Sequence, residues 1–263
     1  NADGSTIRGF VLTNFASSGI VILNGSDGNT VAGNYLGSIG ANGQTTGTTI
    51  GTYGILVQGA NNTIGGNTAA DRNLLAGTGL DAIRISNNGS NLGADNNTVQ
   101  GNWVGLLPDG VTTVASGGTG ITAYSNTQNN RIGGLGAGEG NWIVRTHNSG
   151  IALTGAQGTV VQGNRMGTDL AGTADFGLNQ SGIYLDGGTS NSLIQGNVSA
   201  FSKSEGGIVL ASTAGTGNSL LGNVVYSNFV ANLPLAAAIT VIPIVVMVIY
   251  LLIARRFGAF EHV

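Results

Sequence analysis

Three carboxylates in the second half of the chain are the residues best suited to acid–base chemistry. Asp169, Asp175 and Asp186 lie in what we expect to be consecutive repeats of the pattern described below. Paired carboxylates can act as acid and base in the hydrolysis of a glycosidic bond. The alternative is structural: Asp169 caps a turn, Asp175 sits on an exposed insertion and Asp186 ends a strand. We favour the structural interpretation.

Arg145 and His147 form a second candidate site, because they are separated by a single threonine. A polysaccharide lyase needs a base that takes the proton α to a carboxylate and a cation that holds that carboxylate. The pair could supply both groups. A histidine on an exposed turn is the alternative, and we favour it.

Metal and cofactor sites have weak support in the sequence. The chain has no cysteine, which excludes a thiolate metal site. Calcium is the one cofactor left open, at turns that carry Asp109 or Glu139, although a single carboxylate per turn is a poor calcium ligand set.

Large aromatic side chains could contact sugar rings. The candidates for glycan binding are Trp103, Trp142 and Tyr124. Both tryptophans follow a Gly-Asn pair and occupy predicted strand positions, so packing in a core or at a corner is the alternative, and we favour it for them.

A repeated pattern positions all of these residues. The motif Gly-Ile-x-Leu, with variations, alternates with Asn-Thr-Val/Ile-x-Gly-Asn, and each occurs seven times. The first motif predicts a short strand with one apolar face, and Gly and Asn predict corners where φ is positive. Repetition at this period is typical of a solenoid. Its central residues are Ile20, Ile55, Ile83, Ile121, Ile151, Ile183 and Ile208.

One repeat shows the expected coil in full. In Ser149–Asp169, strands are predicted around Ile151, Val160 and Met166, with corners between them. Asparagines that repeat at one corner can form a ladder of side-chain amides. The repeats are longer than a bare coil, which predicts insertions at Ser38–Thr52, Asn87–Asp95, Leu107–Thr119 and Leu170–Gln180.

A longer period is also present. Asn-x-Ile-Gly-Gly occurs at 62–66 and again at 130–134, an offset of 68 residues, and Gly-Asn-x-x-Gly recurs with similar offsets. The sequence therefore predicts a duplicated unit of two coils within about seven coils.

The composition excludes several functions. Only 8% of the 263 residues are charged, 47 are glycine, and the net charge is −3. Basic residues are scattered and do not interleave with aromatics, so we expect no nucleic-acid partner.

The segments NTIGGNTAADRNLLAG, NTVQGNWVG and VVQGNRMGTDLAGTADFG carry a resemblance to right-handed parallel β-helix repeat proteins of the pectin-lyase-like group. It covers about residues 1–228. It implies an all-β, right-handed parallel β-helix in a secreted or surface-attached prokaryotic protein. Such repeats define the scaffold, and the activity must be argued from the site.

The last residues differ in character. Residues 233–254 include no charged side chain and are long enough to span a bilayer, so we predict one transmembrane helix after a linker at 229–232. Arg255 and Arg256 follow at once, which predicts a cytoplasmic tail at 255–263 and an extracytoplasmic β-helix in a cell envelope. Leu233 begins the membrane anchor, Pro243 lies within it, and Tyr250 suits an interface.

Residues 222–263 also resemble the last helix and cytoplasmic end of permeases of binding-protein-dependent ABC transporters. One helix cannot form a transport path, so the resemblance implies a membrane topology for this segment and does not imply transport. The leading functional hypothesis is a membrane-anchored, non-catalytic scaffold for adhesion, glycan contact or docking to a membrane complex. The alternatives are a carbohydrate-active enzyme that uses a lateral groove, and a component or remnant of a transporter.

Overall fold

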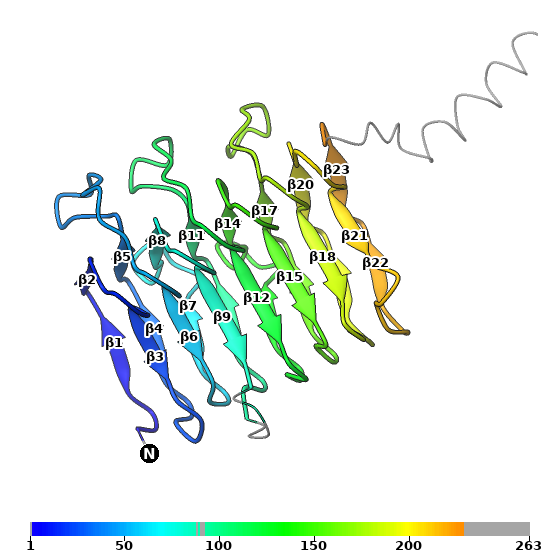
Figure 1. Cartoon of the computed structure of the whole chain (residues 1–263), viewed down its shortest axis with the longest axis horizontal. Helices are drawn as coiled ribbons and strands as arrows, with labels where there is room; N and C mark the ends of the chain where they lie inside the picture. The colour runs from blue at the N-terminus through cyan, green and yellow to red at the C-terminus, as the bar shows by residue number, and fades with distance from the viewer. Residues whose placement is uncertain (1, 88, 90–92, 229–263) are drawn as a thin grey trace, which may run out of the picture. The chain divides into compact units, whose positions relative to one another are not determined.

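A computed structural model describes residues 2–87, 89 and 93–228, and these residues form only β-strands, turns and connecting segments. The strands stack in three parallel sheets, here called A, B and C (Figure 1). The chain passes through the sheets in the order A, B, C and then returns to A one coil further on. This is the architecture of a parallel β-helix, as the sequence predicts.

Sheets A and B each have eight strands and sheet C has seven. Sheet A contains β1 (Thr6–Arg8), β4 (Thr30–Ala32), β7 (Thr63–Gly65), β10 (Thr98–Gln100), β13 (Arg131–Gly133), β16 (Val160–Gln162), β19 (Leu193–Gln195) and β22 (Ser219–Leu221). Sheet B contains β2 (Val11–Leu12), β5 (Tyr35–Gly37), β8 (Leu74–Ala76), β11 (Trp103–Val104), β14 (Trp142–Ile143), β17 (Arg165–Met166), β20 (Val198–Ala200) and β23 (Val224–Tyr226). Sheet C contains β3 (Ile20–Ile22), β6 (Ile55–Val57), β9 (Ile83–Ser86), β12 (Ile121–Tyr124), β15 (Ile151–Thr154), β18 (Ile183–Asp186) and β21 (Ile208–Leu210).

The register of sheet C confirms the predicted alignment of the coils. All seven central isoleucines pair with one another in a single row, from Ile20 on β3 to Ile208 on β21. Alternate residues of each strand point inward. In the inner coils these are aliphatic side chains, such as Ile83 and Ile85, and they are fully buried. Their burial supplies most of the favourable free energy of folding.

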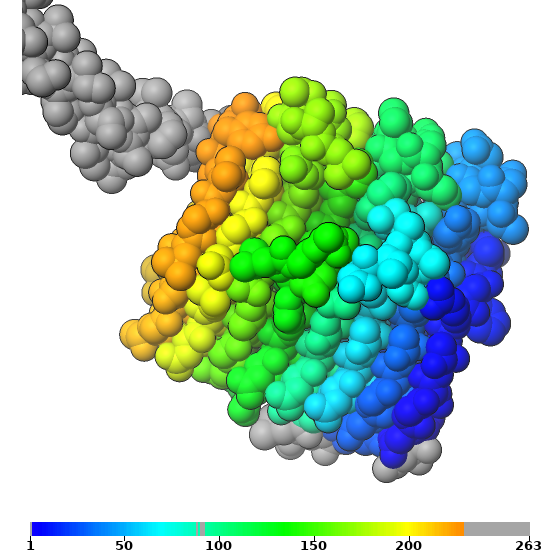
Figure 2. All heavy atoms as spheres, turned by 180° about the vertical axis from the view of Figure 1, so that it is seen from behind, coloured from blue at the N-terminus to red at the C-terminus, as the bar shows by residue number. Residues whose placement is uncertain are grey.

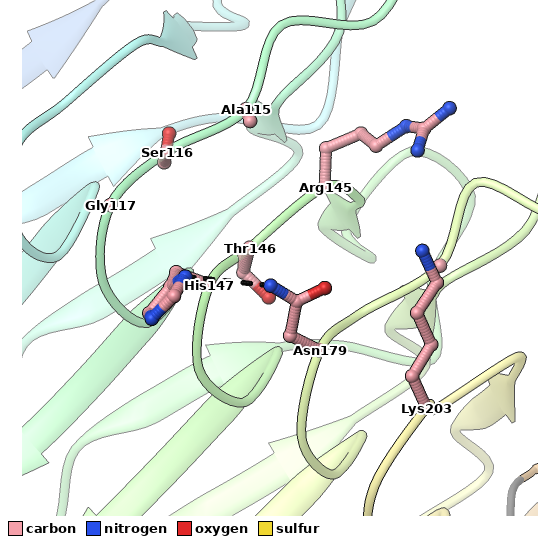
Figure 3. Close-up of a pocket in the computed structure, with 9 residues that line it drawn as sticks. Ala115, Ser116, Gly117, Arg145, Thr146, His147, Asn179 and Lys203 are labelled. Carbon is pink, nitrogen blue, oxygen red and sulfur yellow. Dashed lines mark hydrogen bonds between the residues drawn. The ribbon is translucent and has the colours of Figure 1, made fainter.

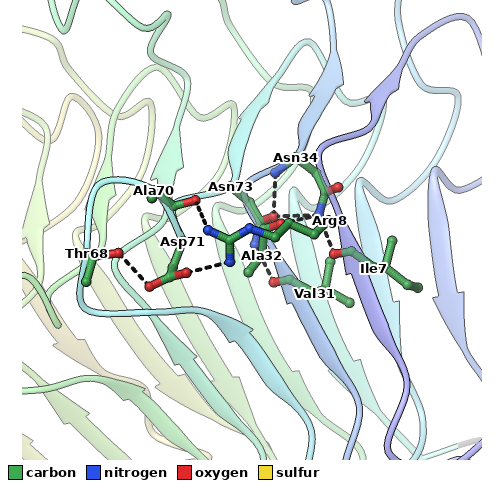
Figure 4. Close-up of polar contacts among 9 residues, drawn as sticks. All are labelled: Ile7, Arg8, Val31, Ala32, Asn34, Thr68, Ala70, Asp71 and Asn73. Atoms are coloured by element: carbon green, nitrogen blue, oxygen red, sulfur yellow. Dashed lines mark hydrogen bonds and ion pairs between the residues drawn. The ribbon is translucent and has the colours of Figure 1, made fainter.

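An asparagine ladder runs along the corner between sheets A and B and confirms the prediction of stacked amides. In each step, Nδ2 of one asparagine donates to Oδ1 of the next at 2.9–3.0 Å. The first step, from Asn34 to Asn73, appears in Figure 4. The ladder consists of Asn34, Asn73, Asn102, Asn141, Asn164, Asn197 and Asn223.

A second, shorter ladder precedes sheet A. Its members are Asn29, Asn62, Asn97 and Asn130, joined at 3.0–3.1 Å. Thr159 and Ser192 occupy the next two coils, so the amide ladder stops there.

Glycine at the corner between sheets B and C is a steric requirement. Gly37 has φ of 94°, and a Cβ atom there would overlap the carbonyl oxygen of Ala76 in the next coil. Only glycine combines this conformation with so close an approach.

Long loops follow sheet B on every second coil, which confirms a two-coil unit. Each loop closes with an antiparallel bridge: Ile39 with Thr45, Leu106 with Thr113, and Thr168 with Asp175. The three loops project from the same side of the coils after β5, β11 and β17 (Figure 1). A second set of insertions, residues 66–72 and 134–140, lies between sheets A and B of alternate coils.

The predicted membrane anchor, with Leu233, Pro243, Tyr250, Arg255 and Arg256, lies outside the described residues, as do the predicted linker and cytoplasmic tail. Among residues 2–87, 89 and 93–228, no helix is long and apolar enough to cross a membrane.

The asparagine ladder generates a stability prediction. Asn102→Ala removes an amide that bonds to Asn73, Asn141 and two carbonyl groups, and it leaves buried partners unsatisfied. We expect a loss of about 2–4 kcal/mol, since each unsatisfied buried group costs roughly 1–3 kcal/mol. Urea unfolding followed by circular dichroism measures it. Asn67→Ala, on an exposed loop residue, is the matched control. Equal stability of the two variants would contradict a stabilising ladder.

Candidate functional site

The three carboxylates Asp169, Asp175 and Asp186 lie on two different elements of the coil. Asp169 and Asp175 belong to a single loop rather than to consecutive coils, which corrects the expected arrangement. Asp186 is the last residue of β18 in sheet C.

The contacts of these carboxylates are local. Backbone N–H groups of Ala174 and Thr173 donate to Oδ1 of Asp169 at 3.0 and 2.7 Å and hold the pKa of this carboxyl below its usual value. Asp175 accepts from the N–H of Gly177 at 2.8 Å. A carboxyl group kept ionised by backbone donors is unsuited to act as a general acid.

Arg145 and His147 do share a groove, at the corner between sheets B and C (Figure 3). Its volume is about 310 Å³, and consecutive corners line it. Asn179 Nδ2 lies 3.4 Å from His147 Nδ1, and Lys203 comes from the next coil. The lining contains these three basic side chains and no carboxylate.

Arg145 has a left-handed backbone, as do Phe201 and Ser227 after the sheet B strands of later coils. The φ of Arg145 is 54°, a left-handed conformation that costs a non-glycine residue about 1–2 kcal/mol. Arg145 Nε donates to Thr113 Oγ1 at 3.2 Å, and none of the ion pairs among described residues involves Arg145 or Lys203. Cations without an ion pair at a groove are a reason to consider ligand binding there.

Trp103 and Trp142 lie side by side on the outer face of sheet B. Their ring centroids are 5.0 Å apart with an interplanar angle of 86°, an edge-to-face contact. Trp142 is buried and donates from Nε1 to the Thr168 carbonyl at 2.6 Å. Trp103 is half-buried, and the guanidinium of Arg72 lies over its ring, 3.9 Å from the centroid.

The two tryptophans and Arg72 line a cleft of about 430 Å³. Its other lining groups include Arg165, Leu135, Leu170 and several glycines. Figure 2 shows this side of the molecule, with residues 66–72 in cyan and 134–140 in green standing out in one row and the three long loops in another. The cleft therefore draws its walls from both sets of insertions.

A smaller depression of about 110 Å³ is also lined by Arg72 and Trp103. Tyr35, Leu74 and Pro108 line it as well. The stacked pair of Arg72 and Trp103 therefore lines both the cleft and the smaller depression. Tyr124 lies elsewhere, exposed at the end of β12 in sheet C, where Arg84 covers its ring at 4.4 Å.

The carboxylates considered for calcium have other partners. Asp109 caps its own loop by accepting from the N–H groups of Val111 and Thr112 at 3.0 and 2.8 Å. Glu139 forms an ion pair with Arg131 at 3.0 Å. Within the part of the chain that the structure describes, no group of three or more His, Asp or Glu side chains could hold a metal ion.

Sequence reasoning missed Arg72, Arg165 and Lys203. The 68-residue offset contains the signal for Arg72, since it aligns residues 66–72 with 134–140 and places Arg72 directly before a ladder asparagine. That position puts it one coil away from Trp103.

Comparison with models of known protein families gives no match. The chain is similar to the inner membrane ABC transporter permease protein YdcU of Escherichia coli strain K12, with 35% identity over 68 residues. These residues are 25% of this chain and 22% of that protein, so the chain spans about a fifth of the length of this relative. So short a match does not place the chain in the permease family.

Proposed function

We propose that this chain is a membrane-anchored surface module whose right-handed parallel β-helix contacts glycans and catalyses no reaction. The cleft at Trp103 is the observation that carries the proposal, because it offers aromatic and aliphatic surface between two rows of loops. Binding sites for sugars use such apolar surface beside a few polar groups. The solenoid itself supplies a rigid face on which further loops can be displayed.

The non-catalytic part of the proposal has its own support. Asp169 and Asp175 serve their own loop, and Asp186 lies on a different sheet. Hydrolysis of a glycosidic bond needs two carboxyl groups placed on either side of that bond. Backbone donors keep Asp169 ionised, which does not suit the acid of such a pair.

Membrane attachment through residues 233–254 is part of the same proposal and is supported by their composition. Docking to a membrane complex is one role that such an anchor allows. Descent from a transporter component is the weaker alternative, since the similarity to the permease is confined to 68 residues.

Trp103 is the residue that tests glycan contact. We expect Trp103→Ala to lower the affinity of the full chain for a bound oligosaccharide by at least tenfold, because it removes the ring and the support for Arg72. Glycan arrays identify the ligand and calorimetry measures its affinity. Tyr124→Ala, on sheet C, is the control, and an equal loss in both variants would contradict the site.

Membrane topology tests the anchor. We expect the full chain to resist carbonate extraction and the β-helix to be cut by protease added from the extracytoplasmic side. Residues 255–263 should stay protected until the membrane is opened. Release by carbonate would contradict the anchor and leave the glycan test unaffected.

A lyase is the second candidate function, because Arg145 and His147 lie in one groove with Lys203. His147 would take the proton α to a uronate carboxylate held by the cations. The C–O bond at the β position would break, and the leaving oxygen would take a proton from water.

The proposed function predicts no lyase product. We expect acidic polysaccharides incubated with the full chain to yield no unsaturated uronate, as measured by ultraviolet absorbance. Product that disappears in His147→Gln but persists in Trp103→Ala would replace the binding function with a lyase.

A further inference from the structure

Arg72 and Arg165 leave positive charge in the sheet B cleft without a protein counter-ion. Arg72 Nε is buried and has no hydrogen-bond partner, and burial lowers the pKa of its guanidinium from an initially very high value, so it stays charged. Arg165 Nη1 makes only a long contact of 3.4 Å to the carbonyl of Asp169. Neither arginine takes part in an ion pair among the described residues.

The nearby carboxylates are paired elsewhere. Asp71 precedes Arg72 in the chain, yet it binds Arg8 Nη1 at 2.7 Å and accepts from Thr68 (Figure 4). Glu139, on the loop that forms one wall of the cleft, is paired with Arg131 at 3.0 Å. Asp169 faces backbone donors of its own loop. A cation that its neighbours leave unneutralised favours an anionic ligand.

Arg72 differs in its surroundings from Arg8 and Arg131, which form ion pairs. Arg8 and Arg131 each hold an acidic residue at the equivalent position of two aligned loops, Asp71 and Glu139. One residue further on, Arg72 is replaced by Gly140 in the second loop. Gly140 has no side chain to fill the space, and it lines the cleft.

The walls of the cleft leave room and apolar surface for a sugar ring. Gly134, Gly136 and Gly138 from one insertion contribute backbone without side chains. Leu135 on this insertion and Leu170 on the long loop after β17 are 60% and 65% exposed and line the same cleft. Exposed leucines on two walls, with part of Trp103, offer apolar surface to the face of a sugar.

We propose that the sheet B cleft binds an anionic glycan, with one oxyanion on Arg72 and another on Arg165, and with a sugar ring against Leu135, Leu170 and Trp103. The inference depends on the proposed glycan contact and adds its charge class and the residues that select it. Carboxylate of a uronate and sulfate of a sulfated sugar share the chemistry that guanidinium groups recognise.

Calorimetry on the full chain tests the inference, in a detergent without a sugar headgroup. The probes are a hexagalacturonate, a sulfated galactan oligosaccharide and a neutral galactan oligosaccharide of similar length. We expect at least one acidic probe to bind tenfold or more tightly than the neutral one, with affinity falling as salt rises. Which acidic probe binds distinguishes carboxylate from sulfate.

Substitutions of the cleft arginines test whether these residues bind the acidic probe. Arg72→Gln and Arg165→Gln should each weaken the acidic probe about tenfold or more and leave the neutral probe unchanged, since charged hydrogen bonds are lost. Arg72→Lys should retain part of the affinity. Arg145→Gln and Lys203→Gln, in the separate groove, are controls that should retain full affinity. Thermal unfolding checks that each variant is folded. Leu170→Ser changes an exposed residue of the cleft wall, and we expect it to weaken binding through the loss of apolar contact with the sugar ring.

Three results would overturn the inference. Equal binding of acidic and neutral probes, unaffected by the arginine variants, removes the charge class and leaves glycan contact intact. Binding lost in Arg145→Gln or Lys203→Gln but not in Arg72→Gln moves the ligand to the other groove. Absence of binding by all probes and by a glycan array contradicts both this inference and the proposed function.

Discussion

The asparagine ladder between sheets A and B is the constraint on which the rest of the structure depends. Successive members are 39, 29, 39, 23, 33 and 26 residues apart, yet their amides meet at 2.9 or 3.0 Å in every step. Coil length therefore varies widely while the corner stays fixed. Because each buried amide must be satisfied by the coil above and below, a shifted coil would break several hydrogen bonds at once.

This fixed corner allows insertions without loss of register, and the insertions carry the chemistry. Residues 66–72 end immediately before Asn73, and residues 134–140 end before Asn141. The ladder thus holds the base of each loop in a defined place above sheet B. With the long loops after sheet B repeating on the same two-coil period, the two rows enclose one face of the solenoid. The cleft follows from stacking and does not need a separate domain.

The fold could be predicted from the sequence because its determinants are local and repeated. Ile151 marks a strand and Asn164 marks a corner, and equivalent residues do so in the other coils. A wrong prediction for one coil is therefore corrected by the pattern of the others. The site could not be predicted equally well. Asp169 has acidic chemistry, but its partners are backbone N–H groups of its own loop, which leave no pattern in side-chain types. Arg72 becomes informative only when the register places it over Trp103.

The proposal of a binding function rests on the environments of the charged groups. The carboxyl groups of Asp71, Asp109 and Asp169 each have a lowered pKa, because hydroxyl, guanidinium or backbone donors stabilise the ionised form. A catalytic acid needs the opposite environment, one that keeps its proton near neutral pH. Four cations that line clefts take part in no ion pair among the described residues: Arg72, Arg145, Arg165 and Lys203. In a chain with only 8% charged residues, cations without an ion pair beside an aromatic cleft are the basis of the proposal that this cleft binds an external anion.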